Sequence, residues 1–258
     1  MNCPFKKLIV ILILIFLNGC AIGPHRGDPF ESINRKIYTF NYSVDKSITK
    51  PIAKTYSKYA PNVAKHGIRN FFQNLGMIST ALNNIFQLKL HKTPDDLLRI
   101  TLNSTVGVGG LFDIATRLGI PKNNEDFGQT LGHWGVRSGP YLMIPFVGPT
   151  TVRDGLGRPL DVITNPVSSL ISDPTTTYSL TALQITDTRA RLLTVSDIID
   201  QQLDPYAFIR DNFLDRRASL VEDRHPNNKG ESPGALVPEK SLLEMEKELF
   251  GDEPLGDF

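Results

Sequence analysis

The chain has 258 residues, enough to bury a core without disulfides or metals, as one large domain or two small ones. Its 28 Lys and Arg residues against 27 Asp and Glu residues give a net charge of +1, which argues against a nucleic-acid partner. With 40% hydrophobic and 21% charged residues the chain is charge-poor for a soluble protein. No stretch reaches the roughly 20 apolar residues of a spanning helix, so we expect a soluble protein or one that meets lipid by another route.

The first nineteen residues have the pattern of a secretory signal peptide. Lys6 and Lys7 precede ten apolar residues, and Asn18-Gly19-Cys20 follows them. A small residue directly before a cysteine, after an apolar run, resembles a bacterial lipobox, although an ordinary signal peptide with an incidental cysteine has a similar pattern. We expect residues 1–19 to be removed and Cys20 to carry lipid, which would anchor the chain firmly to a membrane. Ala21, where Asp would signal retention at the inner membrane, favours the outer membrane, with the anchored chain facing the periplasm.

Prolines near predicted helix starts, such as Pro29, Pro51 and Pro205, indicate many medium-length helices and little sheet. The strongest helical periodicity runs from Ile68 to Phe86, where apolar residues recur every three or four positions. Two more helices are predicted, one continuous from Leu180 to Ile199 and one from Tyr206 to Leu220, both with charges on the side away from the core. The predicted fold class is therefore all-α.

Three segments of the first half lack ionisable side chains almost entirely. Residues 70–88 have none, and their polar positions are Asn, Gln, Ser and Thr; residues 100–112 and 138–152 are similarly poor in charge and contain several glycines or prolines. Charges are costly near a bilayer, and broken backbone is tolerated there only inside the protein or along a cavity. We therefore expect helices that lie within a membrane around their own polar space. The alternative is a soluble core helix that uses Asn and Gln at domain contacts.

Positive charge is concentrated between Arg35 and Arg69, where eight Lys and Arg residues accompany one Asp, a net charge of +7. Lysines recur every four residues from Lys46 to Lys58, and tyrosines lie between them, although Pro51 is expected to divide this helix. Such a surface suits the headgroup level of a membrane, while a solvated helix face is the simpler interpretation.

The last segment, residues 225–258, is predicted to be a flexible acidic tail. Residues 226–258 carry eight acids against three lysines, a net charge of −5, with Pro, Asn and Gly. A short amphipathic stretch from Leu242 to Phe250 either docks a soluble partner or is incidental.

Catalytic or metal-binding chemistry has little support in the sequence. The five histidines are scattered, none followed by a second His at three or four positions, and the common hydrolase, nucleotide and zinc motifs are missing. Glu125-Asp126 is either an acid/base pair or a helix cap, and Ser138 near His133 is the only local hint of a hydrolase. We expect a protein that is not an enzyme, with no cofactor and no metal.

Several motifs along the chain form one set. Two of them are long blocks, E-D-F-G-Q-T-L-G at 125–132 and G-P-Y-L-M-I-P at 139–145. The shorter ones are Asp28-Pro29-Phe30-Glu31, Asn34-Arg35, Phe40-Asn41, Asn70 to Leu75, Asn83-Asn84, Gln87, Asn103 to Asp113, Trp134-Gly135-Val136, Gly148-Pro149 and Arg153-Asp154. Together these motifs resemble the VacJ/MlaA family of outer-membrane lipoproteins. The resemblance covers roughly residues 20–224 and leaves out the acidic tail.

The resemblance implies a ring-like arrangement of amphipathic, partly broken helices around a central channel. Members of the family associate with trimeric porins and pass mislocalised phospholipid from the outer leaflet to a periplasmic carrier, MlaC. Two alternatives remain open: a porin-binding lipoprotein without a conduit, and a lipoprotein phospholipase.

By this resemblance the channel and its gate involve residues in three places. Phe40 and Asn41 are expected near the channel. The run from Ser138 to Pro149 is expected to form a Gly/Pro-hinged loop or, alternatively, a rigid turn, and its candidates are Gly139, Pro140, Tyr141, Pro145 and Gly148. Arg153 and Asp154 either meet a headgroup or pair with other charges.

Overall fold

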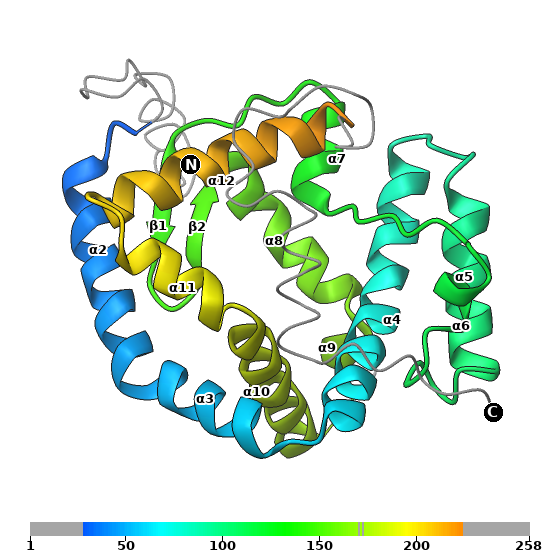
Figure 1. The fold of residues 1–258 in the computed structure, drawn as a ribbon. Coiled ribbons are helices and arrows are strands. Elements are labelled where there is room, and N and C mark those ends of the chain that lie inside the picture. Colours follow the sequence, from blue (N-terminus) through cyan, green and yellow to red (C-terminus); the bar gives the residue numbers. More distant parts are fainter. Residues whose placement is uncertain (1–27, 170, 172, 224–258) are drawn as a thin grey trace, which may run out of the picture.

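The computed structural model describes residues 28–169, 171 and 173–223, so Cys20, the predicted signal peptide and the acidic tail lie outside the described residues. Helices dominate the described part, and one short hairpin of two strands interrupts them (Figure 1). In chain order the elements are α2 (Glu31–Val44), η1 (Asp45–Thr49), α3 (Lys50–Tyr59), α4 (Asn62–Phe86), α5 (Thr93–Thr105), α6 (Ile114–Arg117), α7 (Phe127–His133), β1 (Tyr141–Ile144), β2 (Gly148–Thr151), α8 (Val152–Thr164), α9 (Pro166–Ser169), α10 (Pro174–Arg191), α11 (Leu193–Asp200) and α12 (Pro205–Val221).

The elements close into a ring, as Figure 1 shows. Beginning at α2, each member of the circuit contacts the next: α2 continues through η1 into α3, α3 packs on α10, α10 on α4, α4 on α7, α7 on α12, α12 on β2, and β1 on α2. The helix α8 runs inward from the hairpin and packs on α7, while α5 and α6 form a layer outside α4. The predicted all-α class with a ring-like arrangement is therefore confirmed, with the hairpin as an addition.

The predicted helices from Ile68 to Phe86 and from Tyr206 to Leu220 are confirmed as parts of α4 and α12. The single helix predicted from Leu180 to Ile199 is wrong, because the chain ends α10 at Arg191 and starts α11 at Leu193. The break lets the chain follow the curve of the ring. One straight helix of this length would point away from the ring.

Pro51 does not divide the basic helix as expected. A proline ring clashes with the carbonyl four residues earlier in a regular α-helix. Here the turn before it widens into the π-helix η1, so that helical backbone continues from Glu31 to Tyr59. The hydroxyl of Thr49 also donates a hydrogen bond to the Asp45 carboxylate inside this turn.

The expectation of a Gly/Pro-hinged loop between Ser138 and Pro149 is also corrected, because this run forms an antiparallel hairpin. Tyr141 pairs with Thr151 and Ile144 with Gly148. Pro149 is compatible with a strand here because a two-stranded sheet has only edge strands, where one missing N–H is tolerated. The turn Pro145–Val147 holds Phe146 at a positive φ of 62°.

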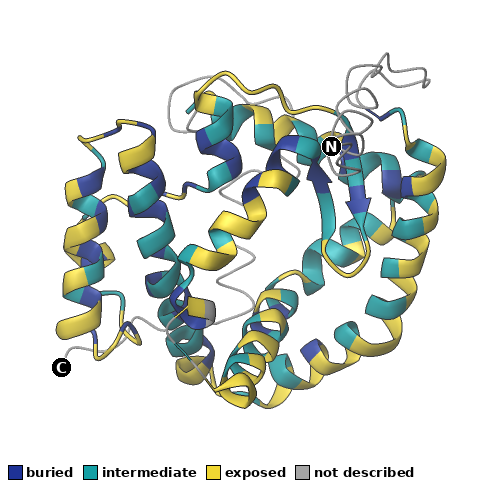
Figure 2. Cartoon of the chain, turned by 180° about the vertical axis from the view of Figure 1, so that it is seen from behind, coloured by how far each residue is buried: buried dark blue, intermediate teal, exposed yellow. Residues whose placement is uncertain are grey.

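The interior is polar where most proteins are apolar. Among the described residues the buried side chains comprise 23 polar or charged and 10 hydrophobic ones, whereas 31 large hydrophobic side chains are exposed. Exposed positions occur on most of the helices of the ring (Figure 2). An apolar core cluster of Tyr141, Met143 and Tyr206 lies under the hairpin. Elsewhere hydrogen bonds and ion pairs join the elements.

One such network joins α7, α8 and α12. The Arg217 guanidinium donates to the carboxylates of Asp126, at 2.5 and 3.0 Å, and of Asp154, at 2.8 and 3.0 Å. Burial alone would raise the pKa of Asp126, but the hydrogen bonds and charge of Arg217 outweigh it and lower that pKa. The pair of Arg217 and Asp126 therefore stabilises the ring chiefly when the Asp126 carboxylate is ionised.

Replacing Arg217 by Met should destabilise the fold by about 1 kcal/mol at pH 7, because the half-buried Asp126 carboxylate loses the guanidinium that pairs with it, while the buried Asp154 keeps Arg153. Since the folded-state pKa of Asp126 lies below its unfolded value of about 3.9, the lost stability is present above that pH and disappears as the pH falls through the folded pKa. Thermal unfolding at pH 7 and below pH 4 should show the deficit shrinking in acid. The neighbouring exposed residue offers the control, Arg216→Met, which should leave stability within about 0.5 kcal/mol. An equal deficit at both pH values would contradict this account.

Candidate functional site

The helix α2 holds the hairpin by two asparagines. The amide nitrogen of Asn34 donates to the Tyr141 carbonyl at 3.1 Å, and its side-chain oxygen accepts from the Met143 N–H at 2.9 Å. Seven residues later, Asn41 repeats the pattern, donating to the Ile144 carbonyl at 3.0 Å and accepting from the Phe146 N–H at 2.8 Å. Each asparagine thus takes the place of a neighbouring strand for the open edge of β1.

The spacing of the two asparagines explains this fit. Seven residues of α-helix advance by about 10.5 Å and make nearly two turns, so both side chains lie on the same face of α2. The paired positions on the strand are three residues apart, which is about 10 Å of extended chain. The two distances match, so one face of α2 can form hydrogen bonds with two successive pairs of backbone C=O and N–H groups along β1 and its turn.

The tip of the hairpin is apolar and exposed. Phe146 is 77% exposed and packs edge-to-face against Phe40 of α2, with ring centroids 5.2 Å apart. Val147 beside it is also exposed. Phe40 and Asn41 therefore both fix this tip, one through ring packing and the other through hydrogen bonds.

The base of the hairpin is close-packed. Gly139 has a φ of +67°, and a Cβ on it would lie 3.1 Å from the Cβ of Val152, so a larger residue would be both strained and crowded. The Pro140 carbonyl accepts from the Val152 N–H, which ties the hairpin to the start of α8. Gly148, with a φ of +94°, faces open space.

The structure thus brings most of the predicted site residues together. Tyr141 is fully buried, and its ring packs against those of Tyr206 and Phe213. The other candidates of the 139–148 run lie in or beside the hairpin, and Phe40 and Asn41 bind it: Gly139, Pro140, Pro145 and Gly148.

Arg153 and Asp154 lie apart from the hairpin tip, buried at the start of α8. Arg153 donates to Asp154 at 2.9 and 3.0 Å, and Asp154 also accepts from Arg217. Of the two alternatives for this pair, pairing with other charges is what the structure shows. Asp126 is likewise a helix cap, accepting from the Gln129 N–H.

Asn34 was not among the site candidates, although it belongs to the Asn34-Arg35 motif of the resemblance and its partner Tyr141 was a candidate. Asn34 is buried, binds the Asp28 carboxylate at 2.8 Å, and that carboxylate also accepts from the Tyr206 hydroxyl. The signal that could have found it is the seven-residue repeat of Asn on one helix face, Asn34 and Asn41, before a strand-forming run.

The uncharged polar face of α4 does not line an open space as expected. Asn84 donates to Asp96 at 2.6 Å, Gln87 to Glu125 at 3.0 Å, and Asn83 accepts from Thr130. These side chains are buried against α5, α7 and the loop between them, so they form contacts within the ring itself. Such contacts differ both from the expected polar space and from the alternative of Asn and Gln at subunit or domain contacts. The apolar face of α4 is the one left partly exposed, ending at Ile85 and Phe86.

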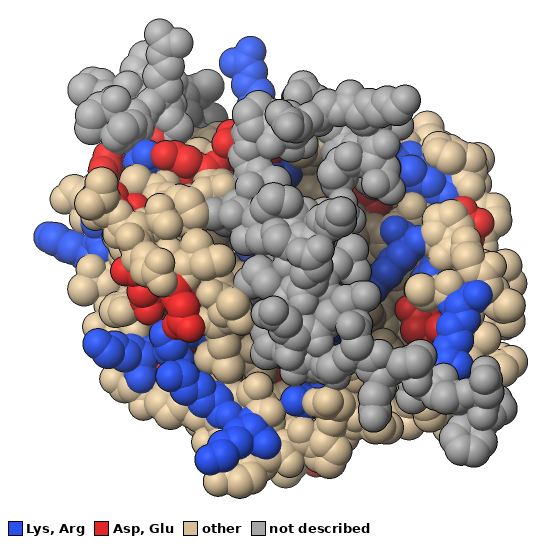
Figure 3. Space-filling view, in the orientation of Figure 1, with Lys and Arg blue, Asp and Glu red and all other residues tan. Residues whose placement is uncertain are grey.

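Positive charge lies along one edge of the ring, near α3 (Figure 3). Lys46, Lys54 and Lys58 are exposed there, whereas Lys50 turns toward Asp197 and Asp200 of α11. Exposed Ile48 and Ile52 accompany the three lysines, so this edge is amphipathic.

Within the described residues, no helix is both long enough and apolar enough to span a bilayer, and no group of His, Cys, Asp or Glu is suited to hold a metal ion. The hydrogen bonds found in this part of the chain include none between Ser138 and His133.

The fold and site define a class of protein: a ring of amphipathic helices with a polar interior, an apolar exterior and a clamped hairpin. The model of the MlaA lipoprotein family matches residues 26–220, so the chain belongs to the MlaA lipoprotein family.

Known relatives agree with this assignment. The intermembrane phospholipid transport system lipoprotein MlaA of Escherichia coli K12 is 33% identical over 241 residues, which cover 90% of this chain and 94% of that protein. A protein of Rickettsia bellii is 34% identical over 221 residues, covering 82% of each. A solved structure described as the structural basis for maintenance of bacterial outer membrane lipid asymmetry matches with a TM-score of 0.68 and 32% identity, covering 76% of this chain and all of that one.

Removing the Asn41 side chain should free the hairpin turn. Asn41→Ala loses two hydrogen bonds worth about 1 kcal/mol each, so amide exchange at Phe146 should become about 30-fold faster. Ser43→Ala on the same helix, which loses only a bond to its own helix carbonyl, is the control and should leave that exchange unchanged. Unaltered exchange at Phe146 in Asn41→Ala would show that the asparagine does not hold the turn.

Proposed function

We propose that this chain is a lipid-anchored component of a phospholipid transport system at the outer membrane. It lets mislocalised phospholipids leave the outer leaflet through a channel in its ring and reach a periplasmic lipid carrier of the MlaC kind. The names of its relatives, intermembrane phospholipid transport system lipoproteins, support this assignment. By the same resemblance, its partners include phospholipid and a trimeric porin.

One observation carries the proposal: the chain buries polar side chains and exposes apolar ones. The exposed hydrophobic residues form series on α5 and α8 and at the hairpin tip, for example Leu97 and Leu98, Leu160 and Ile163, and Phe146. Water would penalise such a surface by roughly 25 cal/mol per Å² of apolar area, whereas acyl chains do not. A ring with this surface fits a position within the acyl region of a leaflet.

Phospholipid transfer of this kind needs a path and no covalent chemistry. The main barrier is moving a charged headgroup through an apolar region. A ring of helices lowers that barrier if polar groups accompany the headgroup while the acyl chains remain in apolar surroundings. The chain's part is therefore to bind, orient and shield the lipid.

The hairpin is proposed as the gate of this path. Phe40 and Asn41 hold its tip, and Gly139 and Gly148 provide the positive φ values at its two ends. The base of the hairpin is fixed by Asn34, by the burial of Tyr141 and by the contact of β2 with α12. The part proposed to move is the tip, which is free to swing when the two hydrogen bonds of Asn41 open.

The anchor and the location are proposed from the sequence. Acylated Cys20 would attach the ring to the membrane and present it from the periplasmic side. The exposed lysines near α3, with their neighbouring isoleucines, suit contact with lipid headgroups. The acidic tail is a proposed contact for a soluble partner.

The anchor gives a direct test with a matched control. In a host that lacks its own MlaA lipoprotein, the wild-type chain should lower the phospholipid of the outer leaflet several-fold, measured by labelling surface phosphatidylethanolamine with a membrane-impermeant amine reagent. Cys20→Ser should fail to do so, because the chain is no longer held in the membrane, whereas Cys3→Ser in the removed leader should behave as the wild type. If the wild-type chain leaves surface phospholipid unchanged, the proposed function is wrong.

A second test separates a conduit from a porin-binding scaffold. Gly139→Val strains the base of the hairpin and crowds Val152, so lipid clearance should fall at least fivefold while membrane attachment and porin binding persist. Gly135→Val has a similar positive φ but meets open space, and controls for backbone strain. Normal clearance by a folded Gly139→Val protein would favour the scaffold.

A further inference from the structure

The chain enters the ring through a buried carboxylate. Asp28, the first described residue, is completely buried. Its carboxylate accepts hydrogen bonds from the Asn34 amide at 2.8 Å and from the Tyr206 hydroxyl, and the Nη1 atom of Arg210 lies 3.6 Å away. Because α2 supplies the first of these partners and α12 the other two, one side chain of the entering segment joins both helices.

Asp28 also determines how Asn34 holds the hairpin. An asparagine amide has two N–H hydrogens to donate and one oxygen that accepts. Asn34 donates to the Asp28 carboxylate at 2.8 Å and to the Tyr141 carbonyl at 3.1 Å. Its oxygen accepts from the Met143 N–H at 2.9 Å. Since both hydrogens and the oxygen are in use, the Asp28 carboxylate fixes the orientation in which this amide matches the backbone of β1.

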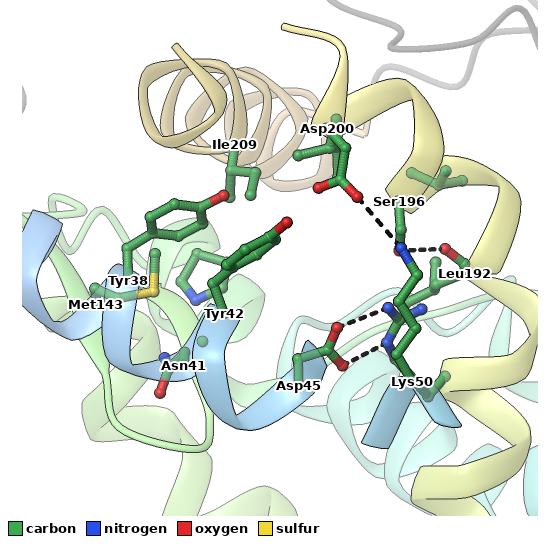
Figure 4. Close-up of a pocket in the computed structure, with 15 residues that line it drawn as sticks. Tyr38, Asn41, Tyr42, Asp45, Lys50, Met143, Leu192, Ser196, Asp200 and Ile209 are labelled. Atoms are coloured by element: carbon green, nitrogen blue, oxygen red, sulfur yellow. Dashed lines mark hydrogen bonds and ion pairs between the residues drawn. The ribbon is translucent and has the colours of Figure 1, made fainter. Parts of the chain in front are cut away.

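The strand position set in this way faces the interior of the ring. The Met143 side chain lines a cavity of about 280 Å³ between the hairpin, α2 and α11, where it lies beside Tyr38 (Figure 4). The base of the proposed gate, and with it this wall of the cavity, is therefore held in place from Asp28. A carboxylate suits this task, because hydrogen bonds to an ionised acceptor are roughly twice as strong as those between neutral groups.

The predicted anchor lies close to this point along the chain. Cys20 precedes Asp28 by eight residues, and a fully extended segment of that length spans at most about 28 Å. A pull from an acylated Cys20 therefore reaches the described part of the ring first at Asp28, which is bound to α12 and, through Asn34, to the hairpin base.

We propose that Asp28 is a positioning residue that couples the membrane anchor to the fixed base of the gate. The inference rests on the proposed function, since it assumes an acylated Cys20 and a hairpin gate. A short tether that ends at the base keeps the base near the leaflet surface, while the tip, held by Asn41, is left to move. Loss of the Asp28 contacts should therefore loosen the base and slacken the tether at the same time.

Amide exchange tests the link to the hairpin, on the full-length acylated protein in phospholipid nanodiscs. Asp28→Asn keeps the size of the side chain but removes its charge and one acceptor, so exchange at the Met143 N–H should become at least tenfold faster. Exchange at the Phe146 N–H in the tip should change less than twofold. Asp211→Asn is the matched control, because it removes an exposed carboxylate bonded to the same Arg210 and leaves Asp28 in place.

The length of the tether tests the link to the anchor. Ten Gly and Ser residues inserted after Gly23 add roughly 35 Å of extended chain, and the same ten residues added after Phe258 are the control. Trp134, the only tryptophan of the chain and half-exposed, reports the position of the ring through its quenching by phospholipids with brominated acyl chains. The insertion after Gly23 should change this quenching at least twofold, and Asp28→Asn should change it in the same direction.

The combined variant separates positioning from a merely structural role. With the long tether, Asp28→Asn should leave the Trp134 quenching as the insertion alone sets it, because a slack tether gains nothing from release at Asp28. A residue that only supports the fold would have the same effect on quenching with either tether. Thermal unfolding confirms that each variant is folded.

Three results would overturn the inference: unchanged exchange at Met143 in Asp28→Asn, quenching that the insertion leaves unchanged, and an effect of Asp28→Asn on quenching that persists in full with the long tether. Lipid clearance by the wild-type chain separates the two proposals. Clearance together with any of these three results rejects the role of Asp28 and keeps the proposed function. The expected exchange and quenching without clearance support the coupling of the anchor to the hairpin and reject the function.

Discussion

The contact of α2 with the open edge of β1 is the constraint from which the proposed gate follows. The circuit of helices closes where α2 meets the hairpin and the start of α12, and at the hairpin Asn34 and Asn41 supply the hydrogen bonds that a third strand would otherwise give. Asn34 is the stronger of the two constraints, because it is buried and also linked to Tyr206 through the Asp28 carboxylate. Asn41 lies at the exposed end, so the hairpin is fixed at its base and held less firmly at its tip. A gate requires such a difference, because its tip must move while its base stays in place.

The polar interior of this protein is stabilised by hydrogen bonds and ion pairs to a greater extent than an ordinary apolar core. Buried Asn, Gln, Asp and Arg side chains connect α4, α5, α7 and α12, alongside buried apolar residues such as Phe72 and Met77. Such contacts are favourable only when every partner is present, because a buried charge without its partner costs several kcal/mol. The network around Arg217 therefore specifies one arrangement of the helices. Many apolar side chains are left exposed, on α5, on the inward-running α8 and at the hairpin tip, and the proposed function places acyl chains against them.

Much of the fold could be predicted from the sequence, and the failures have physical causes. The strong period of α4 and the caps and prolines of α12 are local signals, so both helices were expected. The hairpin was missed because Gly139, Pro140, Pro145, Gly148 and Pro149 indicate turns, and its strands are stabilised by α2, about 100 residues earlier in the chain. The break at Leu192 likewise depends on the path of the ring. The grouping of site residues came from the resemblance of motifs, whereas only the structure shows that Asn34 joins them and that Arg153 and Asp154 pair with charges.

The proposed gate forms one wall of a cavity of about 280 Å³ inside the ring. Met143, Gly148 and Pro149 of the hairpin line the cavity, and Asn41 both lines it and holds the hairpin tip. A ligand that occupies the cavity only when the hairpin is in place stabilises that position, and by linkage the hairpin position sets the affinity for the ligand to the same degree. Such coupling changes how often the path is open. It does not drive transport, so the direction of net flow follows the lipid gradient. A carrier that removes lipid on the periplasmic side would therefore determine direction, while the hairpin and its ligand determine rate.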